Sequence, residues 1–205
     1  MWPILTIFLI LIADQWLKIW VKTNMSYSSH IPIIGNWFRL HFVENNGFAF
    51  GTELNFKYGK LVLSLFRLVA VLGISVYVVS LIRNKGKHKT RLGYVIMVAL
   101  VLAGAIGNII DSTFYGLIFS HAGFHSMGMA TMFPPEGGYA GLFHGQVVDM
   151  FHVSLYEGYF PDWVPFKGGD YFEFFRPVFN IADVSISTGV VGILLFFRGE
   201  LKSFK

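Results

Sequence analysis

The sequence predicts an α-helical integral membrane protein with four transmembrane helices. Of its 205 residues, 54% are hydrophobic and only 14% are charged. The mean hydropathy is +0.57, and such a chain is too apolar for an ordinary soluble domain. Its hydrophobic residues gather in four runs of about 20 residues, the length that an α-helix needs to cross a bilayer. No internal repeat is evident, so we expect one membrane-embedded domain over residues 1–205.

Each hydrophobic run defines one expected span. The spans cover about residues 2–20, 61–82, 92–110 and 181–197, and the long segments between them cover about 21–60 and 111–180. The first run lacks a basic leader and a small-residue cleavage site, so we interpret it as an uncleaved span rather than a signal peptide.

Lysine and arginine residues predict the orientation of these spans. The loop "RNKGKHKTR" at 83–91 carries five of them and the tail "RGELKSFK" carries three, whereas residues 119–180 contain only Lys167 and Arg176. Because cytoplasmic loops are enriched in Lys and Arg, we expect both termini in the cytoplasm and the two long segments outside. Topology therefore explains the net charge of +4, which does not indicate a nucleic-acid partner.

Polar side chains gather near the outer ends of three expected spans. They are Asp14, Gln15 and Lys18 in the first span, Asn108 and Asp111 on one face with Gly104 at the end of the third, and Asn180 and Asp183 at the start of the fourth. Spacings of three and four residues place such groups on one helix face. Ionisable residues within a membrane are costly and usually functional, whereas glycines serve close helix packing. The pattern therefore predicts a polar site near the outer leaflet.

Acid–base chemistry at this site would need a second carboxylate beside Asp183. The candidates are Asp111, Asp149, Asp162 and Asp170. Asp149 lies in "GQVVDMFHV", which is typical of a short strand, whereas Asp162 and Asp170 lie among Gly and Pro residues typical of turns. We therefore favour Asp149 as the partner of Asp183, with Asp111 as the next candidate.

Five sequence blocks, in order, identify a family. They are "DQWLK" (14–18), "NNGFAF" (45–50), "GAIGNIID" (104–111), "VVDMF" (147–151) and "FNIAD" (179–183). Each block is weak alone, but their order, together with four spans, resembles lipoprotein signal peptidase, or signal peptidase II. This family consists of aspartyl proteases of the bacterial inner membrane.

The resemblance implies a catalytic pair, Asp149 and Asp183. It also implies supporting or substrate-binding roles for Asp14, Lys18, Asn45, Gly47, Asn108, Asp111 and Asn180. The implied fold is a four-helix membrane bundle with a small extracytoplasmic β-sheet cradle and a mobile outer lid. Residues 21–60 would supply much of the cradle and the lid.

The resemblance further implies a substrate and a reaction. The substrate would be a prolipoprotein whose future N-terminal cysteine carries diacylglycerol, and the enzyme would cleave just before that cysteine. We expect a monomer that contacts membrane lipid, uses no cofactor or metal and binds no nucleic acid. The active site would lie near the outer leaflet.

The sequence departs from the family pattern in two places. Ser112 stands where the family usually has an arginine that helps to hold the site together, so another group must neutralise the nearby charge. Asp111 and Asp149 are also separated by an extra segment that includes "SHAGFHSMGMATMFPPEGGYAGLFHG". Its Gly, Pro and Met content predicts an irregular outer loop, which we expect to form part of the lid or entrance.

Other classes of function remain possible from the residues alone. A transporter or channel could use intramembrane ionisable groups as an ion path, but these groups cluster on one side of the membrane. A metalloenzyme could use the outer histidines, which are His121, His125, His144 and His152, although no H-E-x-x-H pattern occurs. A noncatalytic scaffold would leave the polar cluster unexplained. The absence of cysteine excludes thiolate nucleophiles and Cys-ligated metal sites.

Overall fold

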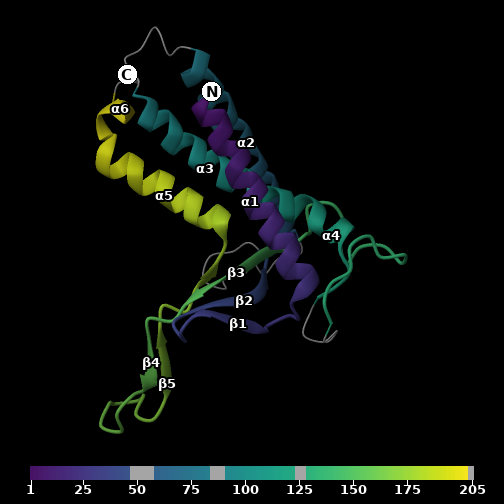
Figure 1. Cartoon of the computed structure of the whole chain (residues 1–205), viewed down its shortest axis with the longest axis vertical. Helices are drawn as coiled ribbons and strands as arrows, with labels where there is room; N and C mark the ends of the chain where they lie inside the picture. The colour runs from purple at the N-terminus through teal and green to yellow at the C-terminus, as the bar shows by residue number, and fades with distance from the viewer. Residues whose placement is uncertain (47–57, 84–90, 123–127, 203–205) are drawn as a thin grey trace.

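The computed structural model describes residues 1–46, 58–83, 91–122 and 128–202 (Figure 1). Long apolar helices form a bundle, and a small antiparallel sheet lies at one end of it. The start of α1 and the short helix α6 (Arg198–Lys202) lie at the opposite end. The described part of the molecule therefore has a helical part and a sheet part, with both ends of the chain approaching the side of the bundle away from the sheet.

Four apolar helices form the bundle. They are α1 (Trp2–Asn24), α2 (Gly59–Arg83), α3 (Leu92–Ile110) and α5 (Ile181–Phe196). Helix α3 is the central one and packs against the other three. The helices α1, α2 and α3 with its continuation are long and apolar enough to cross a membrane, whereas α5 has 16 residues. At 1.5 Å per residue α5 is about 24 Å long, shorter than a hydrocarbon core of roughly 30 Å.

The third helix does not stop at Ile110, where the sequence predicted its end. It continues through a π-helical turn, η2 (Asp111–Tyr115), and a last turn, α4 (Gly116–Ile118). π-helical turns inside helices are frequent at functional sites. In this turn both Asp111 and Ser112 are buried, so the first residues of the expected outer segment belong to the helix that lines the site.

The small sheet has four strands in the order β1-β2-β3-β6, and all neighbours are antiparallel. The strands are β1 (His30–Ile34), β2 (Phe38–Asn45), β3 (Val147–Val153) and β6 (Val178–Phe179). The prediction of a strand around Asp149 is confirmed. The predicted class, apolar helices with a small antiparallel sheet, is confirmed as well.

A bulge in β2 decides which of its side chains lie on the same face of the sheet as Asp149. Leu40 pairs with Phe151 and Val43 pairs with Asp149, so β2 has one residue more than β3 between these two pairs. Because side chains alternate along a strand, the extra residue shifts the alternation of everything that follows it. Asn45 consequently faces the same side of the sheet as Asp149.

The segment between Asp111 and Asp149 packs along the end of α3. Hydrogen bonds join Gly145 N to Ser112 O (2.9 Å), Ala140 N to Gly116 O (2.9 Å) and Phe133 N to Ile118 O (2.7 Å). The described part of this segment is irregular, as predicted, and these backbone hydrogen bonds attach it to η2 and α4.

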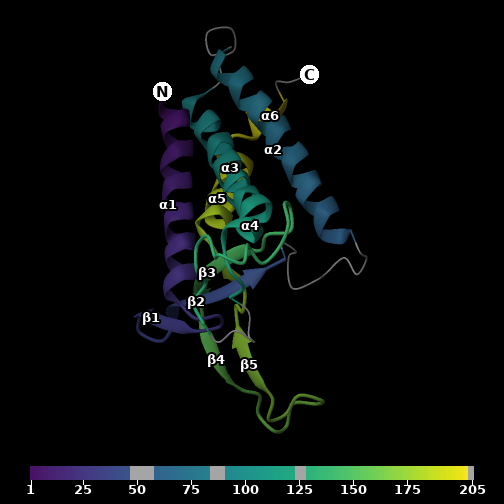
Figure 2. The same cartoon turned by 90° about the vertical axis from the view of Figure 1, so that its right-hand side faces the viewer.

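A hairpin joins β3 to β6 along the chain. Its strands are β4 (Tyr156–Tyr159) and β5 (Tyr171–Phe174), which form a separate two-stranded sheet. The hairpin projects away from the helices, beyond the four-stranded sheet (Figures 1 and 2). The turn between its strands contains Asp162 and Asp170, as their Gly and Pro neighbours predicted.

Candidate active site

The two predicted catalytic aspartates lie where the sheet meets the first turn of α5. Asp149 comes from β3, and Asp183 is the third residue of α5. Asn180 caps that helix: its side chain accepts a hydrogen bond from Asp183 N (2.9 Å), and Asn180 N donates to Asp183 Oδ2 (3.2 Å). This capping box fixes the carboxylate of Asp183 at the helix N-terminus.

Asp149 is 4% exposed and receives a hydrogen bond on each carboxyl oxygen. Asn180 Nδ2 donates to Oδ1 at 2.7 Å, and Asn45 Nδ2 donates to Oδ2 at 3.3 Å. Two amide groups from different strand ends therefore set the orientation of this carboxyl group.

Asparagine side chains also link the two aspartates to each other. Asn108 Nδ2 donates to Asp183 Oδ1 at 2.9 Å, while Asn108 Oδ1 accepts from Asn180 Nδ2 at 3.2 Å. Since Asn180 contacts both Asp149 and Asp183, the two carboxyl groups share one amide network. Such a network holds acid and base groups in a fixed geometry.

Burial changes the acidity of Asp149. Removal from water raises the pKa of Asp149 to about 7, and the negative charge of Asp183 acts in the same direction. The hydrogen bonds from Asn45 and Asn180 and the charge of Lys18 lower this pKa, but they do not offset the burial. A carboxyl group with this pKa can hold a proton near neutral pH, as general acid catalysis requires.

A buried ion cluster lies next to the two aspartates, between α1 and the end of α3. Lys18 Nζ is 2.9 Å from Asp14 Oδ2, from Asp111 Oδ2 and from Asn108 Oδ1. Lys18 is fully buried, so it is the counter-ion of two carboxylates rather than a residue that reaches the membrane surface. It also orients Asn108, the amide that contacts Asp183.

Gln15, which was predicted among the polar groups of the first span but given no role in the site, completes this cluster. Its Nε2 donates to Asp111 Oδ1 (2.9 Å) and to Asp14 Oδ2 (3.1 Å), and its Oε1 accepts from Tyr115 Oη (3.1 Å). Gln15 belongs to the block "DQWLK", and its position beside Asp14 was the available signal.

Glycines let three helices approach at this level. A Cβ atom on Gly104 would collide with Ala182 O, and one on Gly107 would lie 2.7 Å from Asp14 Oδ2. Asp14 Oδ1 in turn accepts from Ala182 N at 2.9 Å, which joins α1 to the start of α5. The prediction that the glycines of "GAIG" serve close packing is confirmed.

Ser112 has no space around it for a long side chain. It is 3% exposed, and its hydroxyl donates to Asn108 O at 3.0 Å. The charge of Asp111 is balanced by Lys18, and Asp111 Oδ2 also accepts from Val148 N at 3.2 Å. Arg67 on α2 adds a second positive charge that acts on Asp111 and on both aspartates of the pair. Positive charge therefore reaches the site from α1 and α2.

Comparison with known proteins identifies the family. The family described as Signal peptidase (SPase) II matches residues 6–198, which is most of the chain. The chain belongs to the signal peptidase II family. Lipoprotein signal peptidase from Porphyromonas gingivalis is 50% identical over 192 residues, which cover 93% of this chain and 80% of the relative. The protein of that name from Amoebophilus asiaticus is 39% identical over 197 residues, covering 95% and 76%.

Solved structures agree with the fold. A bacterial membrane enzyme solved by the in meso method at 2.3 Å resolution superposes with a TM-score of 0.59 at 22% identity, covering 99% of this chain and 91% of that one. A second, at 1.9 Å resolution, gives 0.56 at 23% identity and covers 94% and 90%. Membership in signal peptidase II confirms the prediction of a bacterial membrane protease and decides against a transporter or a scaffold.

Most residues predicted for the signal peptidase II site lie together. Asp14, Lys18, Asn45, Asn108, Asp111, Asp149, Asn180 and Asp183 form one hydrogen-bonded and ion-paired network. Gly47 lies outside the residues that the structure describes. Asp162 and Asp170, the weaker candidates, are exposed in the turn of the hairpin.

The histidines of the metalloenzyme alternative have separate partners. The His121 ring packs on Tyr139, His144 Nδ1 contacts Leu142 O, and His152 lies beside Arg39. Among residues 1–46, 58–83, 91–122 and 128–202, no group of three or more His, Cys, Asp or Glu side chains is placed to hold a metal ion. His125 lies outside these ranges.

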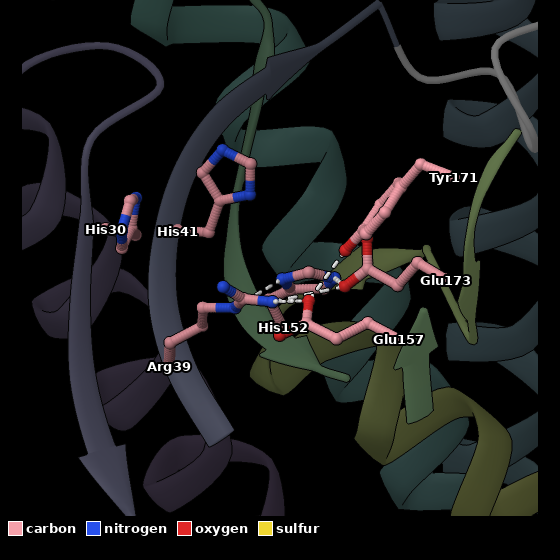
Figure 3. Close-up of a pocket in the computed structure, with 7 residues that line it drawn as sticks. All are labelled: His30, Arg39, His41, His152, Glu157, Tyr171 and Glu173. Atoms are coloured by element: carbon pink, nitrogen blue, oxygen red, sulfur yellow. Dashed lines mark hydrogen bonds and ion pairs between the residues drawn. The ribbon is translucent and has the colours of Figure 1, made fainter. Parts of the chain in front are cut away.

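A second polar hollow lies where β2 and β3 meet the hairpin (Figure 3). Its volume is about 210 Å³, and it is lined by His30, Arg39, His41, His152, Glu157, Tyr171 and Glu173. Arg39 Nε donates to His152 Nδ1 (3.1 Å), and His152 Nε2 lies 3.2 Å from Glu173 Oε1. These contacts join the hairpin to β2 and β3.

Proposed function

We propose that this chain is a prolipoprotein signal peptidase in which Asp149 and Asp183 are the catalytic residues. The observation that supports this proposal best is the shared amide network: Asn180 donates to Asp149 through its side chain and to the Asp183 carboxyl group through its backbone N–H, and Asn108 donates to Asp183. The scissile bond would be the one just before the diacylglyceryl-modified cysteine of the substrate.

The two carboxyl groups would divide the chemistry between them. Two close carboxylates do not both ionise readily, so the pair shares one proton. The more deeply buried Asp149, with a pKa raised to about 7, would be its main holder. Asp183 would then be the ionised member that removes a proton from the attacking water.

Hydrolysis would proceed in two stages, addition of water and loss of the amine, with two proton transfers in each. The water oxygen attacks the scissile carbonyl carbon while its proton passes to Asp183, and Asp149 donates its proton to the carbonyl oxygen. The tetrahedral intermediate then breaks its C–N bond, and the proton on Asp183 passes to the leaving amine, which is the cysteine nitrogen. Transfer of the remaining hydroxyl proton to Asp149 restores the starting state.

The lipid on the substrate would position the peptide bond. The site lies at the ends of apolar helices, so acyl chains could remain in the bilayer while the cysteine reaches the aspartates. Each methylene held in an apolar environment contributes roughly 0.8 kcal/mol to binding. A prolipoprotein without diacylglycerol should therefore be a poor substrate.

The direct test uses purified full-length protein in detergent with a diacylglyceryl prolipoprotein, and mass spectrometry of both products. We expect one cleavage, immediately before the modified cysteine, and little cleavage of the unmodified precursor. A cut at another bond, or equal cleavage of both precursors, would overturn the proposed specificity.

We further propose that both termini are cytoplasmic and that the site lies near the outer leaflet. The Lys and Arg distribution supports this orientation. Because the chain has no cysteine, single Asn36→Cys and Thr90→Cys variants can report it. An impermeant thiol reagent added to spheroplasts should label Asn36→Cys and spare Thr90→Cys; the reverse pattern would contradict the orientation.

We also propose that residues 1–205 form one domain that acts as a monomer. The site combines groups from Asp14 to Asp183 of a single chain, and no second chain is needed to complete its network. Activity per chain should stay constant on dilution in detergent, and native mass spectrometry should give one chain per micelle. Activity that falls with dilution would contradict this.

A further inference from the structure

Asn45, the residue that donates to Asp149, lies between two residues that are held from outside β2. On one side of it, Glu44 forms an ion pair with Lys22 of α1. On the other side, Asn46 Oδ1 accepts hydrogen bonds from Lys60 Nζ (3.0 Å) and from Gln146 Nε2 (3.1 Å). The backbone of Asn45 is thus flanked by two anchored neighbours.

The ion pair between Lys22 and Glu44 is buried. Their side chains are 0% and 3% exposed. Three aromatic rings surround the Lys22 ammonium, with ring centroids 5.0 Å away for Tyr139, 5.4 Å for Phe119 and 5.9 Å for Phe42. Phe119 directly follows α4, and Tyr139 belongs to the extra segment between Asp111 and Asp149, so that segment helps to enclose the pair.

The pair lies on the face of the sheet opposite to the aspartates. Glu44 and Asn45 are consecutive in β2, so their side chains point to opposite faces. Glu44 pairs across the ladder with Val148, the residue before Asp149. One face of this two-strand segment therefore carries the buried ion pair, and the other carries the contact between Asn45 and Asp149.

Stability alone is a weak reason for such a pair. Desolvating two charges costs about as much as their attraction returns, and apolar residues of similar size often serve a core equally well. A buried pair does, however, fix one strand position, because moving either partner leaves an unpaired charge in an apolar core. The location beside Asn45 indicates which position is fixed.

We propose that the buried Lys22–Glu44 pair is a positioning element for catalysis, which holds the end of β2 so that Asn45 donates its hydrogen bond to Asp149. This inference rests on the proposed catalytic role of Asp149. Neither Lys22 nor Glu44 touches the reacting atoms in this proposal. They act through the backbone of β2.

The pH dependence of cleavage reports this role. The charged and polar groups that act on Asp149 are Asp183, Lys18, Arg67, Asn45 and Asn180. Of these, the Asn45 hydrogen bond lowers the pKa of Asp149 because it stabilises the carboxylate. If Asn45 moves away, this pKa rises, and the fall of activity at high pH moves to higher pH. A hydrogen bond to a charged group is worth enough to shift the pKa by roughly one to two units, so the shift of the profile should be of that order.

The experiment compares wild type, Asn45→Ala, Glu44→Gln and the double variant, as purified full-length proteins cleaving a diacylglyceryl prolipoprotein between pH 5 and pH 9. We expect Asn45→Ala and Glu44→Gln to shift the high-pH fall in the same direction. The double variant should shift no further than Asn45→Ala alone. Additive shifts, or an unshifted profile in folded Glu44→Gln, would overturn the proposal.

A second variant covers the case in which Glu44→Gln does not fold. Lys22→Met combined with Glu44→Leu removes both charges and keeps the core filled. Its pH profile of cleavage should shift in the same way as that of Glu44→Gln. An unshifted profile in this folded variant would also overturn the proposal. Glu200→Gln, which removes an ion pair with Arg91 at the other end of the bundle, is the control that should not shift. If the wild type cleaves the substrate and Asp149→Asn does not, the proposed function holds whatever the pH profiles of the Glu44 variants show.

Discussion

Asp149 and His152 lie three residues apart on β3 and face opposite sides of the sheet, and the two faces use the same burial differently. On one face, burial raises the pKa of Asp149 to about 7. On the opposite face, burial lowers the pKa of His152. In both places removal from water favours the neutral form of the side chain.

The neutral forms have different uses. A neutral Asp149 carries a proton that can be donated to a substrate. A neutral His152 uses both ring nitrogens for structure, because Nδ1 accepts from Arg39 Nε while Nε2 lies 3.2 Å from Glu173 Oε1. The same strand therefore supports proton transfer on one face and attachment of the hairpin on the other, and substitutions should separate the two.

The largest effect on activity should come from replacing the two aspartates of the proposed catalytic pair. We expect Asp149→Asn and Asp183→Asn each to lower kcat for the lipidated substrate roughly 10²- to 10⁴-fold, because each removes a proton-transfer group. Asp162→Asn, in the exposed hairpin turn, is the matched control and should cleave normally. If either site variant kept wild-type activity, that aspartate would not be catalytic.

The ion cluster below the pair should give the next largest effect, on stability. Lys18→Met leaves Asp14 and Asp111 without their counter-ion, and breaking a buried pair in this way costs roughly 3–5 kcal/mol. Thermal unfolding in detergent would measure the loss, with Lys167→Met in the exposed hairpin turn as the control. Equal unfolding temperatures for the two variants would contradict the role of Lys18.

The raised pKa of Asp149 predicts how stability changes with pH. The folded protein keeps this proton up to about pH 7, whereas the unfolded chain releases it near its ordinary pKa of 3.8. The contribution of Asp149 to the unfolding free energy should therefore fall as the pH rises from about 4 to about 7, and then level off. Wild type minus Asp149→Asn isolates this term, and a difference that rises with pH would contradict the assignment.

On the opposite face of β3, the lowered pKa of His152 predicts a smaller change of stability with pH, in which stability falls as the pH falls. Its lowered pKa means that its stabilising contribution is complete above its ordinary pKa of 6.5 and is lost as the pH falls below that value. Protonation of Nδ1 would also remove the hydrogen bond from Arg39. We expect amide exchange in β4 and β5, corrected for intrinsic rates, to increase as the pH falls from 7 to 5.

A matched pair of substitutions checks this local effect. His152→Gln should abolish the pH dependence of exchange in the hairpin, whereas His144→Gln, which changes an exposed loop histidine, should leave it intact. Protection of the hairpin that does not vary with pH in the wild type would show that His152 does not control its attachment.

Local spacing was enough to predict much of the site. Asp14 and Lys18 are one helical turn apart, so their shared face follows from helix geometry. Asn180 and Asp183 also lie together, although through a capping box rather than a shared helix face. The strand-like pattern around Asp149 favoured that residue as the partner of Asp183, and the family blocks supported it and added Asn45. The span boundaries were close because hydrophobic length is itself the physical requirement.

The parts that were not predicted depend on contacts between distant positions. Arg39 and His152 are 113 positions apart, and their contact requires the register of β2 on β3. The bulge after Leu40, which turns Asn45 toward Asp149, has no clear signal in the sequence. The ion pair of Lys22 with Glu44 was not predicted either, because a lysine near a span end usually reaches toward the membrane surface rather than into the protein core.

The most direct test of the central claim is infrared titration of the protonated carboxyl groups in the purified protein. If Asp149 and Asp183 share one proton, wild type should have a protonated carboxyl band at pH 6 that disappears as the pH rises through about 7. The band should be missing or displaced in both Asp149→Asn and Asp183→Asn and retained in Asp162→Asn. A wild-type band that is absent at pH 6, or that persists unchanged in both site variants, would contradict the shared proton.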